Sequence, residues 1–332
     1  MRLLVTGGAG YIGGVVATLL TGAGHEVTVI DDLSTGYADA VPAEAAFVKG
    51  TVRDHAQAVL ASGGVAGAGI DAVFHFAAKS LVAESVAKPS LYWEHNLGGT
   101  LALLEAMRVT GTARIVFSST AAVYGEPERV PIDETAPTRP GNPYGASKVA
   151  VDTALAEHAR MHGIGAVSLR YFNVAGAHAG RGGRWLGERH HPETHLIPNI
   201  LRAAAGDAGP GAEVSIFGDD YPTPDGTCVR DYIHVTDLAN AHLLALDACV
   251  PGQHRVYNLG SGSGYSNLEV LQACREVTGR EIPARTGPRR AGDPAVLIAS
   301  SALFHAERGW RPRAGLQAMV ADAWEFTRGQ PR

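Results

Sequence analysis

The first thirteen residues, MRLLVTGGAGYIG, constrain the fold more than any other part of this chain. A short apolar run at 3–5 leads into a glycine-rich turn and then into a helical pattern at 15–20. Glycines at a strand-to-helix turn permit a tight bend, close approach of the backbone to a diphosphate, and close packing of the helix on the strand. The start of the helix also offers unpaired N–H groups to phosphates. The segment therefore predicts a dinucleotide-binding strand–turn–helix unit.

The end of the second predicted strand indicates which dinucleotide binds. The apolar run at 26–30 is followed directly by Asp31 and Asp32. A carboxylate at this point accepts hydrogen bonds from the adenosine ribose hydroxyls and repels a 2′-phosphate. We therefore expect NAD rather than NADP as the cofactor.

Short apolar runs continue to alternate with helical stretches, at 46–48, 72–76, 115–118 and 167–169. Strands separated by helices of this length form parallel βαβ units. The predicted fold class is therefore α/β, with a doubly wound, Rossmann-type parallel sheet that is covered on both faces. Beyond residue 169 the pattern changes, because 180–192 is rich in glycine, arginine and histidine and 206–211 is irregular. This region predicts a loop-bearing cap rather than more sheet.

Two of the predicted helices are long. One follows Pro89, with Ser90 as its N-cap and Gly111 as its stop, and the other follows Pro143 and ends at Gly163. Both carry apolar residues on more than one face. That pattern fits burial against the sheet and a dimer interface of paired helices about equally well.

Tyr144 and Lys148 lie four residues apart at the start of the second long helix. At that spacing the two side chains leave the same helix face. A lysine cation close to a tyrosine hydroxyl favours the phenolate and pulls a pKa of ~10 toward neutrality. We therefore expect Tyr144 to act as a base at physiological pH.

Composition narrows the class of protein. The chain has 332 residues and is 45% hydrophobic, which suits one large domain or two joined domains. Its net charge of −5 gives no excess of positive charge that would attract nucleic acid. Its three cysteines are widely spaced and odd in number, so we expect no disulfide framework and a reducing compartment. The sequence begins with a strand and contains no apolar run of membrane length, so we expect a cytoplasmic protein.

The histidine-rich segment from His190 to His195 reads HHPETH. Its spacing is not that of H-E-x-x-H, Pro192 interrupts a helix, and cysteine partners are absent from it. We expect a loop that lines the mouth of a substrate site, and no metal.

The motif G-x-x-G-x-x-G, the sequence Ser118-Ser119-Thr120 and the motif Y-x-x-x-K together resemble the extended short-chain dehydrogenase/reductase family. The longer stretches FSSTAAVYG, LRYFNVAG and VRDYIHVTD are similar to its UDP-sugar 4-epimerases, and the similarity extends to about Trp324. The resemblance implies an isomerase of carbohydrate metabolism that interconverts UDP-glucose and UDP-galactose as a homodimer. It also implies an interleaved organisation, with 1–170 and about 230–258 binding NAD and 171–229 and 259–332 forming a smaller α/β domain that binds the UDP-sugar.

The resemblance also implies a mechanism. A carbon that bears a hydroxyl is too weakly acidic for direct proton abstraction, so C4 is first oxidised to a ketone. Tyr144 takes the proton of the 4-hydroxyl while hydride passes to NAD⁺, and the 4-keto sugar then rotates and is reduced on its other face. Lys148 holds the nicotinamide ribose, and Thr120 shares a hydrogen bond with the 4-oxygen.

Further site residues follow from the same resemblance. The cofactor would contact Gly7, Gly10, Tyr11, Ile12, Gly13, Asp31, Asp32, Val52, Phe76, Ala77, Ala78, Asn96, Ser118, Tyr144, Lys148 and Tyr171. The UDP-sugar would contact Thr120, Tyr144, Asn173, His195, Leu196, Phe217, Arg230, Arg290, Asp293 and Leu297. Arginine suits diphosphate oxygens, although Arg230 and Arg290 have structural ion pairs with nearby aspartates as an alternative role.

Three positions depart from the family pattern. Thr51 stands where an aspartate commonly contacts adenine, so only neutral contacts are expected there. His195 replaces an asparagine near the substrate phosphates, and Lys79 is displaced by one position from a lysine beside the cofactor. None of the three is expected to touch the reacting atoms.

Other activities remain as alternatives. A nucleotide-sugar 4,6-dehydratase needs an Asp-Glu pair directly after the Ser/Thr, where this chain has Ala121 and Ala122. A regulator that only senses NAD would not need Tyr144 or Lys148. The chain could also be a 4-epimerase of another UDP-sugar, such as UDP-N-acetylglucosamine, a UDP-pentose or UDP-glucuronate. Such an enzyme would differ from an epimerase of UDP-glucose only in its sugar pocket. There the resemblance places Leu297, whose intermediate size predicts partial selectivity against N-acetylated sugars.

Overall fold

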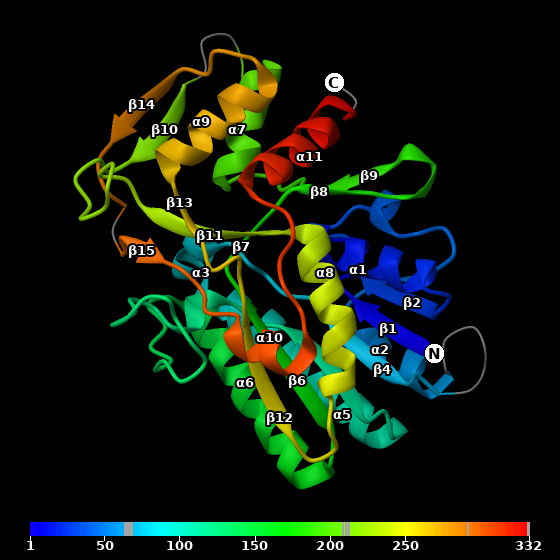
Figure 1. Cartoon of the computed structure of the whole chain (residues 1–332). Coiled ribbons are helices and arrows are strands. Elements are labelled where there is room, and N and C mark those ends of the chain that lie inside the picture. Colours follow the sequence, from blue (N-terminus) through cyan, green and yellow to red (C-terminus); the bar gives the residue numbers. More distant parts are fainter. Residues whose placement is uncertain (63–68, 208, 210–212, 291, 331–332) are drawn as a thin grey trace.

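The computed structural model describes residues 1–62, 69–207, 209, 213–290 and 292–330. Parts of the irregular stretch expected at 206–211, and Ala291, lie outside the described residues. The main feature is a seven-stranded parallel sheet with the order β12-β6-β5-β4-β1-β2-β3 (Figure 1). Its strands are β1 (Arg2–Thr6), β2 (Glu26–Asp31), β3 (Ala46–Lys49), β4 (Ala72–His75), β5 (Arg114–Ser118), β6 (Gly165–Tyr171) and β12 (His254–Leu259). The predicted doubly wound α/β class is confirmed.

Helices cover both faces of this sheet (Figure 1). One layer contains α1 (Tyr11–Gly22) and α8 (Val235–Ala245), and the other contains α2 (Val52–Ser62), α5 (Gly99–Thr110) and α6 (Pro143–His162). Strand β1 serves both layers, because successive side chains of a strand point to opposite faces. Leu3 and Val5 therefore lie in the core beneath α1, and Leu4 lies in the core on the other side.

The two long helices differ in how closely they follow the sequence. Helix α6 begins at Pro143 and ends at Gly163, whose φ is 73°, as expected. The helix after Pro89 has Lys88 rather than Ser90 as its N-cap, because proline takes the first helical position. It runs as α4 (Pro89–Tyr92), a π-helical segment (Trp93–Gly98) and α5, and Gly111 ends it with a φ of 77°.

The second part of the molecule packs around its own core, which includes Ile200, Val270 and Met319. Its helices are α7 (Leu196–Ala205), α9 (Asn267–Thr278) and α11 (Leu316–Arg328), beside the parallel pair β10 (Val214–Phe217) and β14 (Ala284–Gly287) and the hairpin β8 (Ala177–Ala179) and β9 (Trp185–Gly187) (Figure 1). A small mixed sheet contains β7 (Asn173–Ala175), β11 (Val229–His234), β13 (Gly264–Ser266) and β15 (Val296–Leu297). Two further α-helices of the described residues, α3 (Val82–Ala87) and α10 (Ala302–Arg308), contribute no residue to this second core.

The chain passes between the two parts more than once. Strand β11 pairs with β7, β13 and β15, while Ile233 near its end already belongs to the core of the main part, so the return to that part takes place along β11. Helix α10 was expected to belong to the sugar-binding part. It packs on the main part instead, because the fully buried ring of Phe304 contacts Tyr257 of β12, with ring centroids 5.0 Å apart. Among the described residues, we find no helix that combines the length and apolar character needed to cross a membrane.

Candidate active site

A cavity of about 940 Å³ opens at the carboxyl ends of the main-sheet strands. The last residues of β2, β4, β5 and β6 all line it, namely Asp31, His75, Ser118 and Tyr171. Most residues predicted from the sequence lie on its wall: Gly7, Gly10, Tyr11, Ile12, Gly13, Asp31, Asp32, Val52, Phe76, Ala77, Ala78, Ser118, Thr120, Tyr144, Lys148, Tyr171, Asn173, His195, Leu196, Asp293 and Leu297. Asn96, Phe217, Arg230 and Arg290 are not among its lining residues.

The glycine turn between β1 and α1 has no room for side chains. Gly7 has a φ of 73°, and a Cβ on it would lie 2.6 Å from the backbone nitrogen of Ala77. A Cβ on Gly13 would lie 2.2 Å from the carbonyl oxygen of Gly7. The N-cap, Gly10, has no side chain to occupy the helix N–H groups, and the first turn of α1 contains no acidic residue. The turn therefore fits an anionic diphosphate.

Asp31 joins the end of β2 to this turn. Its carboxylate is buried and accepts hydrogen bonds from the N–H of Ala9 at 3.0 Å and of Leu33 at 2.8 Å. Burial raises the pKa of Asp31, and these two hydrogen bonds oppose that rise. Each carboxylate oxygen retains a second lone pair, as a ribose diol requires.

A carboxylate is also present where only neutral contacts were expected. Thr51 donates a hydrogen bond to Oδ2 of Asp54 at 2.6 Å and accepts one from its backbone N–H at 3.2 Å, and both residues line the cavity. The signal for this was in the sequence, because a threonine followed three residues later by an acid is a common helix start. Asp54 thus lies close to the position that Thr51 leaves neutral.

Lys148 and Tyr144 share one face of α6, as predicted. The Lys148 side chain is buried, and its Nζ donates a hydrogen bond to the carbonyl oxygen of Ser118 at 2.8 Å. The same Nζ lies 5.9 Å from the centre of the Tyr144 ring and 4.7 Å from that of Phe117. The sequence pattern alone therefore located this pair.

The pKa values of the pair differ from the expectation. Burial lowers the pKa of Lys148 to about 7, against the opposing charge of Asp152. Burial also raises the pKa of Tyr144, and the hydrogen bond with Thr120 lowers it by less. The lysine therefore does not by itself bring the pKa of Tyr144 to neutrality. Burial excludes water from both side chains, and this disfavours the charged form of each.

Thr120 is fixed by the backbone beside Tyr144. Its Oγ1 accepts the N–H of Ala122 at 3.2 Å, which makes it the N-cap of the short 3₁₀ turn Ala121–Val123. Two residues before Thr120, at the end of β5, the hydroxyl of Ser118 forms a short hydrogen bond with that of Tyr171. Thr120, Tyr144 and Ser118 therefore converge on one stretch of the cavity wall.

Asn96 lies behind the wall instead of on it. The residue is buried in the π-helical segment, and its side chain accepts the N–H of Lys79 at 2.8 Å and donates to the carbonyl of Lys79 at 3.0 Å. It also donates to the hydroxyl of Ser147 at 3.0 Å. Asn96 thus ties the segment after β4 to α6, and a π-helical turn is a frequent device at functional sites.

The predicted diphosphate arginines are engaged with the protein. Arg230 donates to the carbonyl oxygen of Pro294 at 2.8 Å and lies 3.5 Å from the carboxylate of Asp293. The guanidinium of Arg290 stacks on the ring of Phe217, 3.9 Å from its centre. Arg230 therefore makes the ion pair left open from the sequence, and its contact with the substrate diphosphate stays a prediction.

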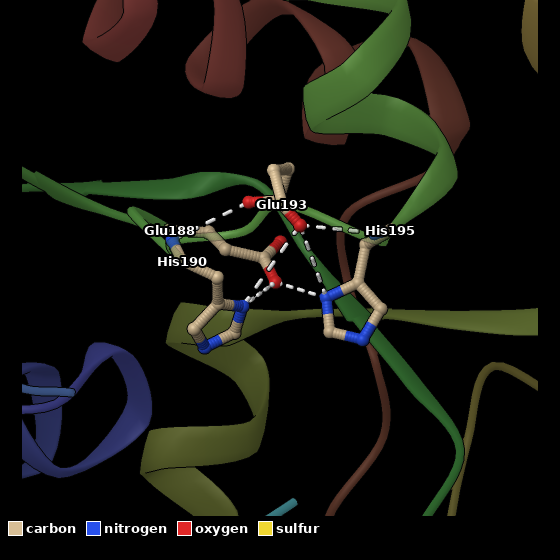
Figure 2. A group of neighbouring side chains, drawn as sticks. All are labelled: Glu188, His190, Glu193 and His195. Carbon is tan, nitrogen blue, oxygen red and sulfur yellow. Dashed lines mark hydrogen bonds and ion pairs between the residues drawn. The ribbon is translucent and has the colours of Figure 1, made fainter. Parts of the chain in front are cut away.

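Sequence reasoning missed one acidic partner of the histidine-rich segment. Glu188, which follows β9, directs Oε1 at the Nδ1 atoms of His190 and His195, and Glu193 lies beside them (Figure 2). Burial opposes both charges, yet their attraction lowers the pKa of Glu188 to about 2 and raises that of His195 to about 9. Glu188, His190 and His195 all line the cavity.

Comparison with known proteins gives one consistent result. Residues 3–260 match the NAD dependent epimerase/dehydratase family. The chain is 54% identical over 328 residues to the UDP-glucose 4-epimerase of Corynebacterium glutamicum, covering 98% of this chain and 96% of that protein. It is 54% identical over 331 residues to the one from Streptomyces lividans, covering 100% and 97%.

Solved structures agree. The UDP-glucose 4-epimerase from Brucella ovis in complex with NAD superposes with a TM-score of 0.89 at 44% identity, covering 98% of both chains. The one from Bifidobacterium longum in complex with NAD⁺ and UDP gives a TM-score of 0.89 at 38% identity, covering 99% of both.

Proposed function

The chain belongs to the NAD dependent epimerase/dehydratase family, and on that premise we propose that it interconverts UDP-glucose and UDP-galactose by inverting C4 of the sugar. The observation that carries this function is the meeting of Tyr144, Lys148 and Thr120 on one wall of a cavity of about 940 Å³. The glycine turn lies along the same cavity. The cavity therefore joins a dinucleotide site to a proton-transfer site.

The cofactor is NAD, which when bound supplies the hydride acceptor and donor for C4. The open N–H groups of α1 would hold its diphosphate, and Asp31 and Asp32 would bind the adenosine ribose. Asp31 also repels a 2′-phosphate, which excludes NADP. Because hydride leaves and returns within one cycle, the nucleotide stays bound.

Tyr144 moves the proton of the 4-hydroxyl. Its oxygen takes that proton when C4 is oxidised and returns it when C4 is reduced from the other face. Burial disfavours the phenolate, so a neighbouring cation must compensate, and protonated Lys148 is placed to do so. Thr120, which hydrogen-bonds with Tyr144, keeps the 4-oxygen in line with the phenol.

Neither alternative activity fits the residues that line the cavity. A 4,6-dehydratase must move the C5 proton and release the 6-hydroxyl. Ala121 and Ala122 line the cavity directly after Thr120, and methyl groups transfer no protons. A regulator that only bound NAD would gain nothing from burying Lys148, which costs desolvation energy.

The chain is further proposed to form a homodimer through α5 and α6. Leu101 and Val109 of α5 are 43% and 54% exposed, and Met161 of α6 is 61% exposed. Large apolar side chains on adjacent helices favour a self-complementary interface. The three cysteines are buried and free, which supports placing the enzyme in a reducing compartment, the cytoplasm. The substrates assign it to galactose metabolism.

A coupled assay tests the function. Purified protein is given UDP-galactose, and the UDP-glucose formed is oxidised by a UDP-glucose dehydrogenase, whose NADH is read at a fixed wavelength. Turnover without any added reductant supports the proposal, with Tyr144→Phe as the inactive control. Failure to convert UDP-galactose, with turnover of another UDP-sugar in a parallel panel, would move the assignment to that sugar.

A further inference from the structure

Four side chains form a compact cluster at one edge of the cavity. Glu188, His190, Glu193 and His195 each point one nitrogen or oxygen atom toward a common centre (Figure 2). These atoms all lie within 4.8 Å of one another. Nδ1 of His190 is 2.9 Å from Oε1 of Glu188 and 3.9 Å from Oε1 of Glu193, and Nδ1 of His195 is 3.7 Å from the latter.

These spacings match a small tetrahedral ion. Zinc binds imidazole nitrogen and carboxylate oxygen at about 2.0–2.2 Å, so its tetrahedral ligand atoms stand about 3.3–3.5 Å apart. Three of the separations, 2.9, 3.9 and 3.7 Å, bracket that value, whereas Nδ1 of His195 and Oε1 of Glu188 are in direct contact and would have to move apart for both to bind the ion. Nδ1 of His190 is also buried, and it faces the carboxylates of Glu188 and Glu193. An ion at the centre would bind this nitrogen and both carboxylates together.

The charge of the cluster points the same way. The side chains of Glu188 and Glu193 are only 7% and 2% exposed, and their facing oxygens lie within 4.8 Å of each other. Two buried carboxylates this close require positive charge beside them, which His195 supplies through its ion pair with Glu188 and which one divalent ion would supply for both carboxylates. The cluster also borders the glycine turn, since both carboxylates act electrostatically on Tyr11, where an uncompensated negative pair would repel bound diphosphates.

We propose that Glu188, His190, Glu193 and His195 bind one zinc ion. Two imidazoles and two carboxylates suit zinc better than magnesium or calcium, which prefer oxygen alone. The backbone N–H groups of Thr194 and His195 donate to Oε1 of Glu193 at 2.8 and 2.9 Å and so orient it, as partners beyond the ligands commonly do.

No sequence motif predicts this site. None of the common zinc motifs is present, because the ligands lie on a loop around Pro192 and not on one helix face. Glu188 enters only because the residue that follows β9 meets His195, the N-cap of α7. The ion joins these two elements, and the first residues of α7, Leu196 to Pro198, line the cavity. The ion therefore stabilises the part of the cavity wall that the start of α7 forms.

Metal content and binding test the proposal. The full-length protein is analysed for zinc, nickel and iron per chain as purified, and again after it has been stripped with a chelator, loaded with zinc and desalted. The parent should retain about one zinc, and Glu188→Gln and His190→Gln should each bind zinc about 100-fold more weakly or worse, since even loss of a partner beyond the ligands costs 10–100-fold. His191→Gln is the matched control, because His191 is exposed and lies next to a proposed ligand, and it should retain zinc like the parent.

Two readouts on the parent protein do not depend on the variants folding. Cobalt(II) loading should give the intense visible absorption of a four-coordinate site, and zinc should raise the thermal midpoint by ligand linkage. An absence of stoichiometric zinc with no cobalt spectrum would overturn the proposal and leave a histidine–glutamate ion-pair network. Retention of zinc by the His190→Gln protein to the same extent as by His191→Gln would overturn it as well, as would stoichiometric iron or nickel in place of zinc.

Discussion

The ammonium group of Lys148 hydrogen-bonds to the carbonyl oxygen of Ser118, at 2.8 Å, across the gap between α6 and the end of β5. This contact anchors the cation at the strand end where the reacting atoms gather. It also explains how a lysine is accommodated in a buried position, since the backbone oxygen replaces part of its lost hydration.

Replacing Tyr144 by Phe should remove most of the activity and leave UDP binding nearly intact. Loss of a general base costs about 10²–10⁴-fold in rate, roughly 3–5 kcal/mol of barrier. Steady-state rates and a UDP titration compare the variant with the parent. Tyr265→Phe serves as control, because Tyr265 belongs to the core of the second part and does not line the cavity. A Tyr144→Phe enzyme with near-parental kcat would disprove the role of the phenol.

Replacing Lys148 by Met should abolish activity and raise the free energy of unfolding at neutral and acidic pH. The net gain should be about 1–3 kcal/mol, because the variant also loses the hydrogen bond to Ser118. The pKa of Lys148 falls from 10.5 in the unfolded chain to about 7 in the folded one. Between these values the unfolded chain binds more protons, so the stability of the parent rises with pH. The advantage of the variant is therefore full below about pH 7 and shrinks toward pH 10.5.

Denaturant unfolding from pH 6 to 10 measures this, with bound nucleotide determined in each sample. Lys49→Met, at an exposed position, should show no such pH-dependent gain. A stability difference that does not change with pH would contradict the burial of a charge at Lys148.

How far the sequence predicts this site depends on how local each feature is. The glycine turn and the Tyr144–Lys148 face are fixed by spacing within one element, and both were found. The cluster with Glu188 depends on β9 ending beside α7, which no local pattern records. Arg230 was predicted to bind phosphate, yet its guanidinium donates to the carbonyl oxygens of Val229 and Pro294 and lies 3.5 Å from the carboxylate of Asp293. The charge of Lys148 was predicted, but the effect of burial on its pKa was not, because burial depends on how the whole core packs around it.

The nucleotide released by denaturing the purified protein should be NAD, not NADP. Asp31 lies at the end of β2, where its carboxylate would repel a 2′-phosphate. Mass spectrometry of the supernatant identifies the nucleotide and its amount per chain. Release of mainly NADP would refute the role given to Asp31.

Leu297→Tyr should remove activity on UDP-N-acetylglucosamine and spare activity on UDP-glucose. Leu297 ends β15 and lines the cavity, and it packs with Tyr124 and Phe172, so a larger ring there narrows the sugar pocket. Added bulk in a tight wall costs about 1–3 kcal/mol, or 10–200-fold in selectivity. The parent should favour UDP-glucose and turn over the N-acetylated sugar measurably but more slowly.

The comparison uses kcat/KM for both sugars in the parent, in Leu297→Tyr and in Ile298→Val. Ile298 is the next residue but does not line the cavity, so its variant should behave like the parent. Equal loss on both sugars in Leu297→Tyr would show that this side chain is not the selective wall.

Leu101→Asp should convert the protein from dimer to monomer. The substitution places a charge in the middle of an apolar face of α5, which an interface would have to desolvate. Sedimentation velocity at several concentrations gives the mass of the parent and the variant. Val130→Asp, at an exposed position far from both helices in the sequence, is the control and should not change the mass. A monomeric parent would remove the dimer from the proposal.

The late position of β12 in the chain has a consequence for folding during synthesis. This strand pairs with β6, yet the whole segment 172–253 lies between them in the sequence. As the chain leaves the ribosome, the open edge of β6 must wait for that segment before it is covered, and exposed edges invite wrong pairing. The first six strands therefore do not form a finished unit by themselves. A truncation before residue 254 should need a chaperone to remain in solution, although it contains the glycine turn, Tyr144 and Lys148.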